Sequence, residues 1–316
     1  MIATTVDRPI SVRAAPRGVT PLARILLAVD GAAASDNAVR AVAALTGRGS
    51  AEVFVVHLSD RRRIRVNSTR PVPNALRTAA AQPDACVESA VRILRSHRVR
   101  VTGTVHRPVD DIGAAIIESA RSLACSLIAV GTGGRGRLGS LLLGSVARHV
   151  IHRADRSVLV APLSCSIPSA FTRILVAVDG SEYSERAVEL AAQAAEVAGA
   201  EVVVVHVCAP HGPPWTRYDR NGLSGRVQPA DTAASLVDGM VGALAARGLT
   251  AFSTVRPARG RPAIGYLAAD VLEAAREYDC QMVVVGAHGH TGHGAVLGGV
   301  AFQLLHSATV PVLVAR

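Results

Sequence analysis

The sequence predicts an α/β fold made of two copies of a doubly wound domain, each with a five-stranded parallel sheet. Short apolar runs such as Leu127–Val130, typical of strands buried on both faces, alternate with longer segments that can form helices. The stretch from Arg24 to His57 recurs from Arg173 to His206 at a constant offset of 149, so that Asp30 matches Asp179. Alternating strands and helices imply right-handed crossovers that cover both faces of the sheet.

Length and composition fit two ordinary globular domains. The chain has 316 residues, of which 49% are hydrophobic and 18% are charged, enough apolar material for two cores. The formal charge of +10 comes from arginine, since the chain holds no lysine, and aromatic residues make up only 3%. Because few aromatic side chains are available to stack on bases, we expect no nucleic-acid partner and attribute the arginine content to coding bias.

Cysteine usage and hydropathy favour a cytoplasmic protein. The five cysteines stand singly without a C-x2-C pair, which fits a reducing compartment and indicates neither a disulfide framework nor a zinc site. No apolar run approaches the ~18–20 residues needed to cross a bilayer. The amino-terminal arginines are not followed by the apolar core of a secretory signal. We therefore expect no membrane association.

The first copy follows a stretch rich in proline and arginine, residues 1–23, which lacks periodicity and is predicted to be a mobile tail. Its first strand ends in the carboxylate of Asp30, Gly31 turns the chain, and Ser35 is the predicted N-cap of the first helix. The later strands are short apolar runs. The expected elements are strands 24–30, 51–58, 99–105, 127–130 and 157–161, helices 36–45, 84–96, 109–124 and 146–152, and an irregular insert at 59–83.

The second copy repeats this order. Ser184 stands ahead of its first helix, as Ser35 does in the first copy, and a second irregular insert occupies residues 208–229. A proline- and serine-containing linker, 162–172, separates the two predicted domains, 24–161 and 173–316. The expected elements of the second copy are strands 173–179, 201–207, 250–255, 282–285 and 311–314, and helices 185–197, 232–247 and 263–277.

A glycine loop follows the central strand of the first copy. Gly131, Gly134 and Gly144-Ser145 give the spacing G-x2-G-x9-G-S, after which a helix can begin. Strand, glycine loop and helix start form a phosphate-binding geometry, because backbone N–H groups without intrahelical partners face the ligand. The spacing is neither the Walker loop nor the dinucleotide fingerprint. Since Asp30 and Gly131 end the first and fourth strands, we expect both to face one crevice.

These features resemble the universal stress protein family over nearly the whole chain outside the tail and inserts. The matching residues are Ala-Val-Asp-Gly at 28–31 and 177–180, the histidines His57 and His206, the glycine loop and the closing Val-Leu-Val strands. The resemblance implies a Rossmann-like strand order of 3-2-1-4-5 and ATP or AMP at the switch point, with Mg²⁺ as a candidate companion. By position, Ala28, Asp30 and Leu58 would border the adenine, Gly131 the ribose, and Gly134, Arg135, Gly144, Ser145 and Val146 the phosphates.

The second copy departs from this pattern. The corresponding set is Ala177, Asp179, Val207, Gly286, Gly289 and Gly299, with Val300 in the place assigned to Ser145. Loss of one hydroxyl contact predicts weaker nucleotide binding there, and an empty second site stays open as an alternative. The loop also contains His288, His290 and His293. We interpret them as part of a phosphate loop and expect no metal site.

Several functional alternatives remain at this point. For Asp30, a ligand contact is favoured over a purely local turn role, and His57 and His206 are expected to be packed structural residues. No catalytic residue is assigned, so the leading hypothesis is a nucleotide-binding regulatory module of the stress response. A slow ATPase, an adenylate-transferring enzyme and a nucleotide-free scaffold are the rivals. Closing strands at Val158–Val160 and Val312–Val314 are expected to pair within the chain as a pseudo-dimer, and a further homodimer is left open, as is the regulatory partner.

Overall fold

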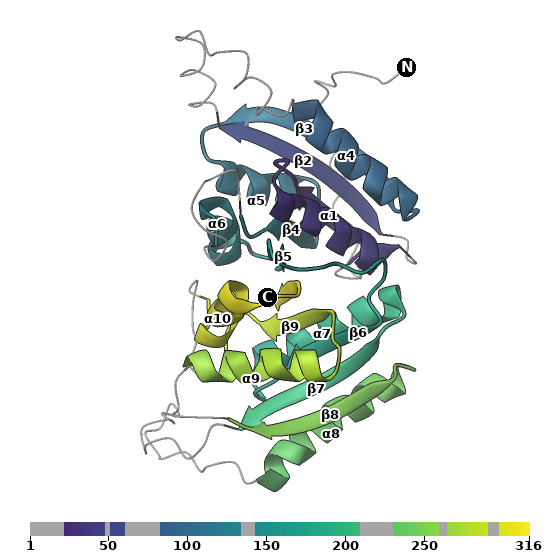
Figure 1. Ribbon diagram of the computed structural model, residues 1–316, viewed down its shortest axis with the longest axis vertical. Coiled ribbons are helices and arrows are strands. Elements are labelled where there is room, and N and C mark those ends of the chain that lie inside the picture. The colour runs from purple at the N-terminus through teal and green to yellow at the C-terminus, as the bar shows by residue number, and fades with distance from the viewer. Residues whose placement is uncertain are drawn as a thin grey trace.

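The computed structural model describes residues 22–47, 51–60, 83–133, 143–208, 230–258, 264–289 and 297–316. Within them, ten strands form one continuous sheet in the order β3-β2-β1-β4-β5-β10-β9-β6-β7-β8 (Figure 1). Each half contributes five parallel strands in the order 3-2-1-4-5. The predicted α/β class, the duplication and the strand order within each copy are therefore confirmed.

The first half contains the predicted alternation of strands and helices. Its strands follow the short apolar runs because every strand except the edge strand is covered on both faces. The elements in chain order are β1 (Arg24–Ala28), α1 (Ala33–Thr46), β2 (Glu52–Asp60), α4 (Pro83–Ser96), β3 (Arg100–Val109), α5 (Ile112–Ser122), β4 (Leu127–Gly131), α6 (Ser145–Arg153) and β5 (Ser157–Ala161).

The second half repeats this order. It includes a helix between its last two strands, α10, which was not predicted from the sequence. The elements are β6 (Arg173–Ala177), α7 (Glu182–Ala198), β7 (Glu201–Cys208), α8 (Ala230–Ala246), β8 (Ala251–Pro257), α9 (Ile264–Glu277), β9 (Met282–Gly286), α10 (Gly299–Ser307) and β10 (Val312–Ala315). α10 follows the glycine loop of the second copy as α6 follows that of the first.

The two halves join through their closing strands. β5 and β10 pair antiparallel, with Val160 opposite Val312 and Val158 opposite Val314. The predicted intramolecular pairing of Val158–Val160 with Val312–Val314 is thus confirmed. It covers an apolar strand edge in each half that would otherwise be open to association. All six residues of the pair that lie in register are essentially inaccessible to solvent, so the junction is part of the core.

Two apolar layers lie on opposite faces of this sheet. α1, α4, α7 and α8 cover one face, and α5, α6, α9 and α10 cover the other (Figure 1). Successive strand residues alternate between the layers: Ile25 and Leu27 pack in the first, and Leu26 in the second. Each layer contains residues of both halves, so the duplication builds two cores that run the length of the molecule.

The linker between the halves is anchored to α1. The side-chain amide of Asn37 donates to the carbonyl oxygens of Pro162, Leu163 and Cys165 at 2.9, 3.1 and 3.3 Å. Phe171, near the other end of the linker, is 1% exposed and belongs to the first layer. The linker is therefore fixed to the core by the buried amide of Asn37 and by the ring of Phe171.

Three predicted helix starts are wrong by a few residues. Ser35 and Ser184 are not N-caps: they lie inside the first turns of α1 and α7, whose N-caps are Ala32 and Ser181. Their hydroxyls instead accept from Asp30 N–H and Gly180 N–H, at 3.2 and 3.1 Å, which moves the helix starts toward the strand. The third wrong start is that of α5, because Val109, where the helix was predicted to begin, belongs to β3.

α5 begins later than predicted, because Asp111 caps it by accepting from Ala114 N–H at 3.0 Å. The predicted tail lies almost wholly outside the described residues, as do most of the two inserts.

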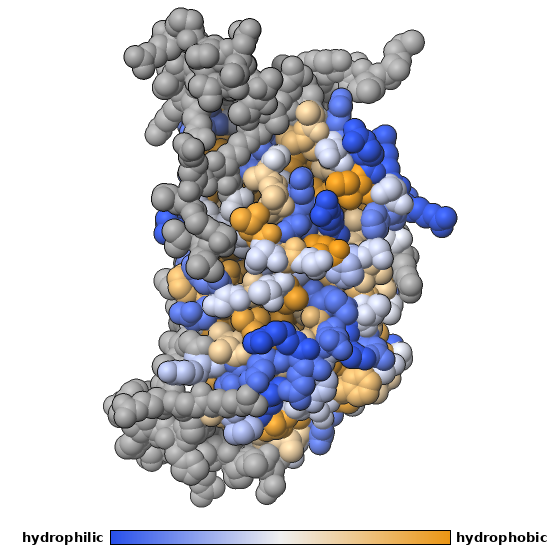
Figure 2. All heavy atoms as spheres, viewed as in Figure 1, coloured by the Kyte–Doolittle hydropathy of each residue, from blue (hydrophilic) through white to orange (hydrophobic). Residues whose placement is uncertain are grey.

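The molecular surface carries mixed side chains. The described part of the face in Figure 2 intersperses hydrophilic and hydrophobic residues over both halves. Among the described residues, no helix is both long and apolar enough to cross a membrane. Large hydrophobic side chains that are exposed stand singly: Leu163, Phe252, Tyr266 and Phe302.

Candidate functional site

The sheet reverses its winding between β1 and β4. These strands are hydrogen-bonded neighbours, and β2 lies beyond β1 while β5 lies beyond β4. The helices that connect the strands on the two sides lie on opposite faces of the sheet. α1, between β1 and β2, packs in one layer, and α5 and α6, before and after β4, pack in the other. Such a switch point leaves a crevice beyond the carboxyl ends of the strands, which is where open α/β sheets bind ligands.

A cavity of about 140 Å³ occupies this crevice in the first half. Seven of the predicted site residues of the first copy line it, and they come from β1, β2, β4 and the start of α6. The prediction for Gly134 and Arg135 lies outside the described residues. The lining residues are Ala28, Val29, Asp30, Ser35, Val56, Leu58, Ile112, Ile116, Val130, Gly131, Thr132, Gly133, Gly144, Ser145, Val146 and Ala147.

The cavity has an apolar part and a polar part. Leu58, Ile112 and Ile116 lie in the same apolar layer and supply aliphatic surface. Asp30 and Ser145 supply a carboxylate and a hydroxyl. Apolar walls with few polar groups are typical of small-molecule sites, where the polar groups set orientation.

Gly131 permits the close approach of β4 to α1. A Cβ at this position would lie 2.4 Å from the backbone carbon and oxygen of Ala34 and 2.6 Å from the backbone nitrogen of Ser35. These are backbone atoms and cannot rotate away. Glycine at the end of this strand is therefore a requirement of the fold, in addition to any contact that it makes with a ligand.

The amino terminus of α6 offers backbone donors to the cavity. Gly144 is its N-cap, has no side chain to cap the helix, and donates its own N–H to Thr132 O at 2.6 Å. The helix provides no acceptor for the N–H groups of Ser145, Val146 and Ala147, and all three residues line the cavity. Together with the helix dipole, these amides favour a bound anion.

Asp30 has a local role as well as a place in the cavity. Its Oδ1 accepts from Ala32 N–H at 2.9 Å, which fixes the turn between β1 and α1. The same residue lines the cavity. The two interpretations of this acid, turn residue and ligand residue, are thus compatible, since the bond to Ala32 uses one carboxylate oxygen and the residue also lines the cavity.

The strand-end histidines hold the strands together. His57 is 8% exposed, and its Nδ1 lies 2.8 Å from Val29 O; His206 Nδ1 lies 2.8 Å from Val178 O in the second half. An imidazole N–H that donates to a neighbouring strand carbonyl is a structural contact. The expectation of packed, structural histidines agrees with this geometry.

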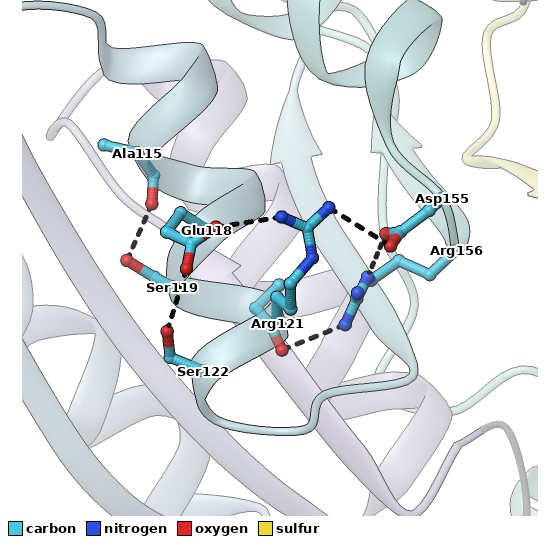
Figure 3. Close-up of polar contacts among 8 residues, drawn as sticks. Ala115, Glu118, Ser119, Arg121, Ser122, Asp155 and Arg156 are labelled. Carbon is cyan, nitrogen blue, oxygen red and sulfur yellow. Dashed lines mark hydrogen bonds and ion pairs between the residues drawn. The ribbon is translucent and has the colours of Figure 1, made fainter.

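α5, which contributes Ile112 and Ile116, is fixed at its carboxyl end by an ion-pair cluster. Figure 3 shows Arg121 between Glu118 and Asp155, at 3.0 and 3.4 Å, with Arg156 beside Asp155 at 2.8 Å. Hydrogen bonding to Arg156 is the main cause that lowers the pKa of Asp155. Arg156 also donates to Ala120 O at 2.9 Å and so caps the helix.

The second half keeps the backbone of the crevice but differs by one residue in register. Gly298 is the N-cap of α10 and donates to Ala287 O at 2.7 Å, as Gly144 does to Thr132 O. Gly298 and Gly299 therefore correspond to Gly144 and Ser145. The sequence alignment that matched Gly299 to Gly144 and Val300 to Ser145 was wrong, because the second loop is one residue shorter than the first.

The other predicted residues of the second half surround the equivalent strand ends. Ala177 ends β6, Val207 lies near the end of β7, and Asp179 Oδ1 accepts from Ser181 N–H at 3.0 Å. A Cβ on Gly289 would lie 2.5 Å from Asp179 Oδ2, so acid and loop are in close contact. At Gly286 a Cβ would lie 2.7 Å from Tyr183 O.

Ser35, Thr132, Ile112 and Ile116 were missed by the sequence interpretation, although all line the cavity. The isoleucines were inside a predicted helix, four residues apart, and that spacing was the available signal that they share one face. Ser35 was assigned to a cap. Thr132 directly follows Gly131 and could have been included with the glycine loop.

Candidate metal ligands and thiols can be compared only within the described part of the chain, which leaves out His290 and His293. This part contains no group of three or more metal-ligating side chains. Two cysteines in matching positions, Cys125 and Cys280, are buried, and burial raises the pKa of each thiol to about 12. Both thiols therefore stay protonated and unreactive at neutral pH.

Comparison with known proteins agrees with this architecture. The model of the universal stress protein family matches residues 22–162 and 170–316. A universal stress protein of Mycolicibacterium smegmatis is 27% identical over 310 residues, which cover 92% of this chain and 96% of the relative. One of Mycobacterium tuberculosis (strain ATCC 25618 / H37Rv) is 30% identical over 200 residues, 60% of this chain and 61% of the relative. A solved universal stress protein structure from Archaeoglobus fulgidus covers 93% of this chain and 98% of its own, with a TM-score of 0.67 and 20% identity, a likeness of fold.

Proposed function

Because the chain belongs to the universal stress protein family, we propose that the crevice of its first half binds an adenine nucleotide, ATP or AMP. The observation that carries this proposal is the cavity itself, in which aliphatic side chains and the uncapped start of α6 face the same space. An adenine ring needs apolar surface, and its phosphates need backbone donors. The cavity offers both at neighbouring positions.

Each lining group has a chemical role in this proposal. Ala28, Leu58 and the isoleucines of α5 would pack on the base, and the second carboxylate oxygen of Asp30 would accept from a ligand N–H or O–H group. Gly131 would lie by the ribose. Gly144, Ser145 and Val146 lie where α6 begins and would surround the phosphates, to which Ser145 and Val146 offer backbone amides and Ser145 adds a hydroxyl donor. Gly134 and Arg135 belong to the same proposed site, as does Mg²⁺ when it accompanies a triphosphate.

The proposed role is that of a regulatory binding module in the stress response. The two domains, 24–161 and 173–316 with the linker 162–172, would act as one pseudo-dimeric unit because their closing strands pair. Nucleotide binding would change which partner the module engages, without a dedicated reaction. In the second half, Ala177, Asp179, Val207, Gly286, Gly289 and Gly299 form the corresponding proposed site, which lacks a hydroxyl at the helix start.

Isothermal titration of the purified protein with ATP and with AMP tests the proposal. Ala28→Phe would fill the cavity from the end of β1, and we expect it to abolish binding in the first half. Ala177→Phe makes the same change at the matching strand end of the second half, and is the control for loss of stability. Wild-type protein that binds neither nucleotide at up to about 5 mM would overturn the proposal. Equal loss in both variants would contradict a site confined to the first half.

A further inference from the structure

An arginine lies one helical turn behind the phosphate end of the cavity. Arg148 is exposed on α6, three residues after Ser145. Residues three apart share one face of a helix, and helical side chains lean toward the amino terminus. Arg148 does not line the cavity itself, but it shares a face of α6 with Ser145, and we expect its side chain to lean toward the turn whose free amides do.

Arg148 has no acidic partner among the described residues. The neighbouring His149 has its Nδ1 3.8 Å from a carboxylate oxygen of Asp111, and no such pair involves Arg148. Its surroundings are basic instead: burial lowers the pKa of His152, and the charges of Arg316, Arg148 and Arg153 lower it further. This face of α6 thus carries, at Arg148, a positive charge that no acid of the described residues pairs with.

The second half lacks both polar groups at this place. Gly299 corresponds to Ser145, and Phe302 corresponds to Arg148, since both pairs stand 154 positions apart in helices that begin at the same point. Phe302 is 37% exposed, and its ring centroid lies 4.2 Å from that of His306. Neither a glycine nor a phenylalanine side chain donates a hydrogen bond to a phosphate.

We propose that Arg148 is the residue by which the first half distinguishes a nucleoside triphosphate from a monophosphate. This inference rests on the proposed nucleotide site. The amides at the start of α6 serve the phosphate group nearest the ribose, which ATP and AMP share. Arg148, farther out along the helix, binds the terminal phosphates that only the longer tail carries, through charge-assisted hydrogen bonds. At the matching positions of α10 the second half has Gly299 and Phe302, so we expect no such distinction from that helix.

The test measures dissociation constants for ATP, ADP and AMP by isothermal titration, for wild type and Arg148→Gln. We expect wild type to bind ATP about tenfold more tightly than AMP, and the variant to bind both about equally, through weaker ATP binding. AMP affinity should stay within about twofold of wild type. Arg148→Lys should keep part of the preference, because it keeps the charge but loses the fork of donors. The ATP affinity of wild type should also fall more steeply with salt than that of Arg148→Gln.

Arg153→Gln is the matched control, since Arg153 is an exposed arginine in the last turn of the same helix. It should leave all three affinities unchanged. An ATP-to-AMP ratio that Arg148→Gln leaves intact would overturn the inference while the proposed function stands. An equal loss for AMP and ATP would also overturn it, because Arg148 would then support the site as a whole. Absence of binding by wild type would instead end the proposed function itself.

Discussion

The two halves of the chain share a backbone and differ in the side chains around the crevice. Both end the strand before the loop in a glycine against which the first helix packs, Gly131 against Ala34 and Gly286 against Tyr183. In the first half, a Cβ on Gly133 would meet nothing within 4 Å. At the matching place in the second, the ring of His288 packs edge-on against Tyr183, with centroids 4.7 Å apart. The comparison separates what the fold requires, which both copies keep, from the described side chains around the crevice, in which the two copies differ.

The largest expected effect concerns the glycine that ends the strand before the loop in both halves. Gly131→Ala should destabilise the protein by ~3 kcal/mol or more, because the added methyl group would lie 2.4 Å from backbone atoms of Ala34. Gly286→Ala should cost less, since its nearest atom is farther away, at 2.7 Å. Urea unfolding of both variants gives the two free energies. A Gly131→Ala protein as stable as wild type would contradict the claim that the fold needs this glycine.

The second prediction compares Asn37 of α1, which holds the linker, with the residue at the matching position of α7. Asn37→Ala should lower the free energy of unfolding by ~2 kcal/mol, because it removes a buried amide that donates to three linker carbonyls. The matching position in the second half is Arg186, which is exposed and pairs with Glu182. Arg186→Ala should change stability by less than ~0.5 kcal/mol. Similar effects of the two substitutions in urea unfolding would show that Asn37 does not fix the junction.

The sequence predicted the sheet well because its signals are local and repeated. Apolar runs located nearly all strands, and the constant offset between Asp30 and Asp179 gave the duplication without any knowledge of contacts. Helix starts were less predictable, because a serine after a strand can cap the helix or lie inside its first turn. Ser35 and Ser184 do the latter, since Asp30 and Asp179 already hold the turns.

Residues of the proposed site could be located from the sequence where their position follows from the backbone, and their role in binding stays a prediction. Strand ends and the glycine loop located seven lining residues of the first half. Ile112 and Ile116 were missed because a helix face can be assigned to a cavity only when the packing of α5 on the sheet is known. The one-residue shift in the second half was missed because glycines at 298 and 299 satisfy two alignments, and the start of α10 decides between them.

The third prediction compares the two helix starts. Ser145→Ala should weaken ATP binding several-fold, up to about tenfold, by removing one hydroxyl donor worth ~0.5–1.5 kcal/mol. Gly299→Ala adds a methyl group at the matching position of α10 and should leave ATP binding within about twofold. Equilibrium dialysis with ATP measures both. If Gly299→Ala weakened binding as much as Ser145→Ala, the two crevices would contribute equally and the functional asymmetry would be lost.

The smallest expected effect is a dependence of stability on pH that comes from His152 of α6. Burial is the main cause that lowers the pKa of His152 below its usual value of 6.5, and the charges of Arg316, Arg148 and Arg153 add to it. The unfolded chain therefore binds a proton at this residue more readily than the folded protein does. Stability is complete above the unfolded pKa, and part of it is lost as the pH falls through 6.5 toward the lower folded pKa.

His152→Gln should accordingly lose less thermal stability than wild type between about pH 7.5 and about pH 5.5. His306→Gln is the matched control, because His306 occupies the same position of α10 and neighbours Phe302 where His152 neighbours an arginine. The melting temperature of each variant at the two pH values gives the comparison. A pH dependence that His152→Gln leaves unchanged, or that His306→Gln reduces to the same extent, would mean that the basic face of α6 does not oppose protonation of His152. The uncompensated positive charge beside the phosphate end of the cavity would then be smaller than the structure indicates, and the expected preference for the longer phosphate tail would shrink with it.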